Sequence, residues 1–283
     1  MTMLDIVTVV FEEELDILQV QAQSIDRFCK NLQVGCVYVI VNDTAQVAEK
    51  IQRSWWGSFE HCVRVVPRDV FDTKFVDNGW VSQQALKLLS ARLSHNQWSM
   101  ILDAKTLVAN HMTPELFFAE NNQLTLGLMP VQEVFAPAAQ IASGMFGIEV
   151  THVAEPTGVP FIIENALVRQ MMSDIQDKTG LKFSEWFQDQ GRLTEFVLYS
   201  AYVKHHYNTL EAVYLGTNTK TLSNNICHSE VARFDQKLQQ AKHNQTYTIG
   251  LHRRAWQQLS MQQKQNYVDH LISLGLARAR MLL

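Results

Sequence analysis

Hydrophobic and polar positions alternate in long blocks over the first hundred residues. Apolar, β-branched runs at residues 5–11, 36–41, 62–66 and 98–102 predict buried strands. Residues 15–28, 45–53 and 81–93 predict helices between them, and the last of these places Val81, Ala85, Leu88, Leu89 and Leu93 on one face. Strands of nearly continuous apolar sequence that alternate with helices are typical of a parallel sheet covered on both faces.

The second half of the chain is less regular. We expect strands at residues 124–130, 142–150, 213–215 and 246–251, and helices at 161–179, 183–188, 194–205 and 260–276. No internal repeat and no linker rich in Pro, Gly or Ser divides the sequence. We therefore predict one α/β domain: a mostly parallel sheet flanked by helices, with C-terminal helical elaborations.

The amino-acid composition argues against several classes of protein. The 283 residues are 47% hydrophobic and 18% charged, which excludes intrinsic disorder. A net charge of −4 argues against a protein that coats nucleic acid. No apolar run reaches the roughly 18 residues that span a bilayer, and the acidic start does not resemble a secretory signal. A cytoplasmic protein without a transmembrane segment is expected.

The residues that follow each predicted strand are the candidates for chemistry, because ligands of open parallel sheets bind beyond the carboxyl ends of the strands. Glu12 and Glu13 follow the first strand, Asn42 and Asp43 the second, and Asp103-Ala104-Lys105 the fourth. The sequence has no GxGxxG, GxxxxGK[ST] or GxSxG motif at these positions, which argues against a dinucleotide-binding fold, a P-loop NTPase and an α/β-hydrolase.

The run GWVSQQALKLLSARLSHNQWSMILDAKTLVANH at residues 79–111 resembles the central part of GT-A glycosyltransferases, in which a helix precedes a buried strand that ends in a DxD motif. The segments QQALKL, ILDAK, TEFVLYSAYV and IGLHRRAW together resemble a bacterial branch of that superfamily. The resemblance implies that residues 1–111 bind a nucleotide-sugar and that residues 112–283 contain the acceptor half. It also implies transfer of a hexosyl or pentosyl group to an acceptor hydroxyl.

This sequence departs from the motif where the superfamily has its second carboxylate. Lys105 stands two residues after Asp103, and the two side chains would share a face if the strand extends that far, because residues i and i+2 of a strand point the same way. Asp103 could hold a divalent cation (Mn or Mg) or the donor sugar, while the Lys105 ammonium could itself hold a phosphate. A structural alternative has Asp103 capping a turn and Lys105 in solvent.

Further site residues follow from the resemblance. It places Gln83, Gln84 and Lys87 at the border of the donor pocket, although the same three residues could form an ordinary solvated helix face. Asn42 and Asp43 would contact the nucleoside. Glu195, a carboxylate among apolar neighbours, would be the general base for the acceptor, or else simply begin a helix.

The segment His252-Arg253-Arg254 completes the predicted donor site. His252 and Arg253, with Lys105, would neutralise the diphosphate, and His252 is a tentative second metal ligand beside Asp103; His228 is its competitor for that role. The acceptor is expected to be a saccharide or a glycolipid rather than nucleic acid. Two other functions stay open: a catalytically degenerate GT-A-like interaction module and a nucleotidyltransferase.

Overall fold

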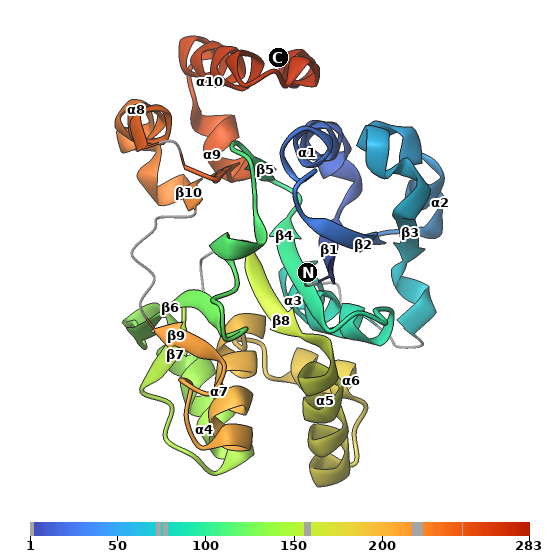
Figure 1. Ribbon diagram of the computed structural model, residues 1–283, viewed down its shortest axis with the longest axis vertical. Helices are drawn as coiled ribbons and strands as arrows, with labels where there is room; N and C mark the ends of the chain where they lie inside the picture. The colour runs from blue at the N-terminus through green and yellow to red at the C-terminus, as the bar shows by residue number, and fades with distance from the viewer. Residues whose placement is uncertain (1–2, 72–74, 76–78, 156–159, 217–222, 245) are drawn as a thin grey trace.

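The computed structural model describes residues 3–71, 75, 79–155, 160–216, 223–244 and 246–283 as a mixed α/β structure (Figure 1). The central sheet has five strands in the order β3-β2-β1-β4-β8. Their bounds are β1 Met3–Val10, β2 Gln33–Val41, β3 Val63–Pro67, β4 Trp98–Asp103 and β8 Phe161–Glu164. The first four strands are mutually parallel and β8 is antiparallel to β4, so the predicted mostly parallel sheet is confirmed.

Two small sheets complete the strand content of the described chain. One has the order β10-β11-β5 and the other β7-β6-β9. Their strands are β5 Thr106–Val108, β6 Leu124–Pro130, β7 His152–Ala154, β9 Tyr214–Gly216, β10 Ser223–Ile226 and β11 Thr248–Leu251. The sheet that contains β5 is important for the site, because β5 follows β4 after only two residues and pairs with β11.

Helices flank the central sheet as predicted. The α-helices are α1 Leu15–Phe28, α2 Ala45–Glu49, α3 Gly79–Leu89, α4 Ala136–Phe146, α5 Asn165–Thr179, α6 Phe183–Asp189, α7 Glu195–Tyr207, α8 Phe234–Asn244, α9 Arg253–Gln258 and α10 Met261–Ser273. Figure 1 places α8, α9 and α10 at the top of the molecule near α1, with α4, α7 and the β7-β6-β9 sheet at the bottom left. Within the part of the chain that is described, no helix combines the length and the apolar composition needed to cross a membrane.

Helix α3 is buried on all sides rather than on one face. It packs against β1, α6 and α7, and every side chain from Val81 to Leu89 is buried. Gln83, Gln84 and Lys87 are 9%, 5% and 3% exposed, so the solvated helix face considered for them is wrong. Local periodicity marks the most apolar stripe of a helix, but it does not show that a second layer of helices covers the opposite stripe.

The prediction of a strand at residues 142–150 is wrong. The segment lies mostly in α4, an Ala-rich helix with Pro137 in its first turn and Gly147 in the left-handed conformation at its C-terminal cap. Ala has the highest helix propensity, and Pro and Gly stand at the two ends where helices accept them.

Other elements differ in their bounds. The predicted helix at residues 161–179 is two elements, because residues 161–164 form β8 and only α5 is helical. The predicted helix at 45–53 ends at Glu49 and is followed by the 3₁₀ segment Arg53–Cys62. Sequence analysis did not predict β5, β7, β10 or α8.

Candidate functional site

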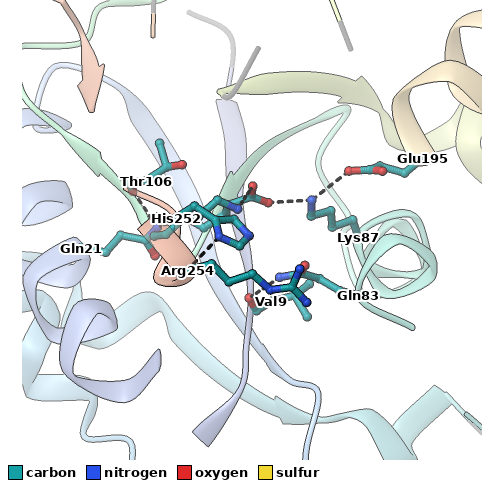
Figure 2. Close-up of polar contacts among 10 residues, drawn as sticks. Val9, Gln21, Gln83, Lys87, Thr106, Glu195, His252 and Arg254 are labelled. Carbon is teal, nitrogen blue, oxygen red and sulfur yellow. Dashed lines mark hydrogen bonds and ion pairs between the residues drawn. The ribbon is translucent and has the colours of Figure 1, made fainter. Parts of the chain in front are cut away.

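The carboxyl ends of β1 and β4 lie side by side, and this edge of the sheet positions the candidate site. Val9 is paired with Asp103 in the parallel register of the two strands, and Val10 is paired with Val41 of β2. Asp103 is the last residue of β4, as the sequence predicted for a strand-end carboxylate. The backbone that follows is held by Gln21 of α1, whose Nε2 donates to the carbonyl oxygens of Asp103 (2.6 Å) and Thr106 (2.8 Å) (Figure 2).

Lys87 of α3 joins two carboxylates that are far apart in the sequence. Its Nζ lies 2.6 Å from Oδ1 of Asp103 and 2.8 Å from Oε1 of Glu195, the first residue of α7 (Figure 2). The Gln84 amide also faces Glu195, and with its nitrogen turned toward the carboxylate it donates to both oxygens. Glu195 is 3% exposed, so this ion pair is withdrawn from solvent.

Lys105 contacts the other side of Asp103. Its Nζ lies 2.7 Å from Oδ2 of Asp103. The strand does not extend to Lys105, because β4 ends at Asp103 and residues 104–105 form a turn, so the turn brings the two side chains together. Each carboxylate oxygen of Asp103 is therefore in contact with one ammonium group. Lys105 is the more accessible of the two lysines, with 26% of its side chain exposed against 4% for Lys87.

Burial and charge oppose each other in setting the pKa values of these groups. Burial alone would raise the pKa of Asp103, but the ammonium groups of Lys105 and Lys87 outweigh it and hold this pKa below its usual range. Burial alone would lower the pKa of Lys87, and the carboxylates of Asp103 and Glu195 raise it instead. Burial raises the pKa of Glu195, and the Asp103 carboxylate also raises it, while the Lys87 ammonium lowers it without cancelling the effect of burial.

The C-terminal cationic segment reaches the same edge of the sheet. The rings of His252 and His228 lie with their centroids 5.8 Å apart and are tilted by 55°, so the structure brings together the two histidines that the sequence treated as competitors. Burial lowers the pKa of His252, and the nearby Lys105, His228, Arg254 and Arg253 lower it further. Its Nδ1 accepts a hydrogen bond from the Arg254 backbone N–H (3.1 Å), which leaves the ring proton on Nε2.

A pocket of about 180 Å³ opens beside Lys105. Arg253 lines it from α9 and is paired with the exposed Glu13. The rest of the wall has two further carboxylates, Glu14 and Asp16, and an apolar and aromatic part that includes Leu251, Trp256 and Tyr267. The pocket thus combines two cationic side chains, three carboxylates and an aromatic surface.

Asn42 and Asp43 have structural contacts of their own. Asn42 is 2% exposed, and its Nδ2 donates to Ser82 Oγ (2.9 Å) and to the Gly79 carbonyl (3.2 Å), which ties the end of β2 to the start of α3. Asp43 accepts from the Thr44 backbone N–H at 2.8 Å. The expected nucleoside contacts of both residues stay a prediction.

A divalent cation does not fit this arrangement of side chains. Both Asp103 oxygens already contact ammonium groups, and one of these belongs to Lys105, where a DxD motif would have its second carboxylate. Among the described residues, no group of three His, Cys, Asp or Glu side chains could hold a metal ion. His252, the tentative second ligand, is surrounded by Lys105, His228, Arg253 and Arg254, which would repel a cation.

Sequence analysis missed three contributors to this region. Gln21 lies on the apolar face of α1 between Leu18 and Ile25, and a polar residue on a buried face is a usable signal. Glu14 lines the pocket, and burial raises its pKa. Trp256 carries no local signal, because its place in the pocket depends on how α9 packs.

Comparisons with known proteins give a family and several similar structures. The profile of the family of unknown function DUF6492 matches residues 5–273. The chain belongs to this family. A search of the curated proteins finds no match.

Solved structures that resemble the chain include glycosyltransferases. The galactosyltransferase LgtC, in complex with donor and acceptor sugar analogs, has a TM-score of 0.49 at 12% identity and covers 95% of each chain. The bifunctional glycosyltransferase WbbM, in its apo form, has a TM-score of 0.48 at 12% identity, with 95% of this chain covering 50% of that one. An active-site mutant of LgtC has a TM-score of 0.47 at 12% identity, again with 95% of each chain covered.

Removing the central ammonium should destabilise the protein. We expect Lys87→Met to lower the free energy of unfolding by about 3–5 kcal/mol, because it leaves two carboxylates buried without their shared partner. Chemical denaturation measures this loss, with Lys30→Met as the control, since Lys30 pairs with Asp26 and is 57% exposed. A loss no larger than the control's would show that the ion pair contributes nothing.

The stability of Lys87→Met should depend on pH in a defined direction. Without Lys87, burial keeps the folded-state pKa of Glu195 above its unfolded-state value, so the folded protein gains stability by binding a proton there. The loss of unfolding free energy in Lys87→Met relative to wild type should therefore be largest near pH 8 and shrink as the pH falls toward about 5. A loss of stability relative to wild type that grows on acidification would contradict this account.

Proposed function

We propose that this chain transfers a sugar from a nucleotide-diphospho-sugar to an acceptor hydroxyl. The observation that carries the proposal is that two cationic side chains, Lys105 and Arg253, line one pocket at the carboxyl edge of the sheet, where Asp103 holds Lys105. The motifs at residues 79–111 and 249–256, which resemble GT-A glycosyltransferases, supply the reaction class.

The chemistry follows from the charges. When the bond from the anomeric carbon to the diphosphate breaks, the departing oxygens gain negative charge. Lys105 and Arg253 lie where they can neutralise it, since both line the same pocket. His252, neutral and protonated on Nε2, is suited to donate a hydrogen bond to a phosphate oxygen.

The aromatic part of the pocket wall, next to the cationic side chains, could bind the nucleoside of the donor. Trp256 offers an aromatic ring close to Arg253, and a base that stacks on such a ring gains affinity without needing a specific hydrogen-bond pattern. We propose that the diphosphate lies between Lys105 and Arg253 and that the base lies toward Trp256. The acceptor, a saccharide or a glycolipid, would approach the donor sugar from the Asp103 side.

Glu195 is better placed to position Lys87 than to meet an acceptor. A general base must come within hydrogen-bond distance of the hydroxyl it deprotonates. Glu195 is buried and engaged with Lys87 and Gln84. The departing diphosphate is then the group that takes the acceptor proton, and Glu195 acts by fixing Lys87 and, through it, Asp103.

Glu195→Gln distinguishes the two roles. If Glu195 positions Lys87, both kcat and the affinity for the nucleotide-sugar should fall, because Asp103 and Lys105 lose their fixed geometry. If it is the acceptor base, kcat alone should fall, by about 10²–10⁴, with donor affinity unchanged. Donor affinity by calorimetry, with melting curves to check folding, reads out the difference; unchanged affinity would contradict the positioning role.

Trp256→Ala tests where the base binds. Loss of a stacking ring should weaken the binding of UDP or GDP by about 5- to 100-fold, the range measured for base–aromatic stacking. Binding of inorganic pyrophosphate, which has no base, should not change. Equal effects on the nucleotide and on pyrophosphate would place the base elsewhere.

The interaction-module alternative has one observation in its favour: both oxygens of Asp103 are already engaged by lysines. Calorimetric titration with UDP-, GDP- and CMP-sugars separates it from an enzyme. Binding of one donor, followed by its turnover with an acceptor, supports glycosyl transfer, whereas no binding of any of them supports the module.

A further inference from the structure

Asp103 is the strand-end carboxylate at which a DxD motif would bind a divalent cation, and here it holds two lysines. Lys87 Nζ lies 2.6 Å from Oδ1 and Lys105 Nζ lies 2.7 Å from Oδ2. Mg²⁺ binds carboxylate oxygens at about 2.0–2.1 Å, so a cation on Asp103 would lie close to both ammonium groups. Like charges at such a separation repel strongly in a partly buried site.

Lys87 cannot give way to a cation. It is 3% exposed and lies between two carboxylates, so its ammonium group has no path to solvent without breaking both ion pairs. Its charge is also permanent near neutral pH, because Asp103 and Glu195 raise its pKa. One side of Asp103 is therefore closed to metal.

Lys105 has the opposite properties. Its side chain is 26% exposed, it lines the pocket with Arg253, and an ammonium group has three N–H donors. Asp103 takes one of them and fixes the position of the nitrogen. The others can reach a ligand in the pocket.

We propose that the Lys105 ammonium, held by Asp103, replaces the divalent cation and binds the donor diphosphate directly, so that donor binding is independent of metal. This inference rests on the proposed function, because it concerns the diphosphate of the same donor. Lys87 is a positioning residue in it: by neutralising Asp103 from the buried side, it directs the other carboxylate oxygen to Lys105.

The test uses calorimetry with inorganic pyrophosphate, UDP and GDP as probes, in EDTA and in Mn²⁺. Wild-type protein should bind with the same affinity in both conditions. Lys105→Ala should weaken binding by about 10- to 100-fold, as expected for the loss of a charge-assisted hydrogen bond. Lys30→Ala, a surface lysine paired with Asp26, is the matched control and should have no effect.

Lys105→Asp provides the converse experiment. It creates the missing second carboxylate at a position whose side chain already contacts Asp103. This variant should bind pyrophosphate poorly in EDTA and regain affinity in Mn²⁺. It should also bind Mn²⁺ itself, as seen by electron paramagnetic resonance, whereas wild-type protein should not.

Each result decides between the proposals. If wild-type protein binds the probes only with Mn²⁺, or if Lys105→Ala binds normally, the replacement of metal by Lys105 is wrong while the donor site stands. If wild-type protein binds none of the probes in either condition, the donor site itself is wrong, and this inference fails with it.

Discussion

The buried ammonium group of Lys87 is the constraint on which the candidate site depends. It brings the end of β4 to the start of α7 through contacts with Asp103 and Glu195, residues 92 positions apart in the chain. Two carboxylates at this depth would be costly without a cation between them. Lys87 therefore fixes the geometry of the sheet edge. It also offsets the cost of keeping the Asp103 and Glu195 carboxylates ionised there. The burial of α3 between β1, α6 and α7 keeps the lysine in this place.

The parts of this arrangement that are local in sequence could be predicted. Near-continuous apolar runs marked β1, β2 and β4, and the spacing of Asp103 and Lys105 placed both side chains at one strand end. The ion pair through Lys87 could not be predicted in the same way. The periodicity of α3 put Lys87 opposite the apolar stripe, which suggested solvent, and only the packing of α6 and α7 turns that position into the interior.

The errors in the fold have the same origin. Three of the four residues of β8 carry apolar side chains that suit a helix or a strand equally, and the antiparallel pairing of β8 with β4 decides the outcome. The strands β5, β7 and β10 are three or four residues long, so their sequence carries little pattern. In α4 the local signals were present, since Pro137 and Gly147 bracket an Ala-rich segment. These signals favour a helix, so α4 could have been predicted from the sequence.

The charges at the sheet edge also determine which cations remain for a ligand. Asp103, Glu195, Lys87 and Lys105 sum to no net charge, so an incoming diphosphate must obtain its excess positive charge from the C-terminal segment. His252 is neutral, because burial and its cationic neighbours lower its pKa, and this leaves Arg253 and Arg254. Arg253 is paired with Glu13, and both side chains are more than half exposed. Exposed ion pairs contribute little to stability, so this pair can open at small cost and exchange a carboxylate for a phosphate. Lys87, which is buried, thus supplies fixed geometry, and Arg253, which is exposed, supplies charge that can be redirected to a ligand.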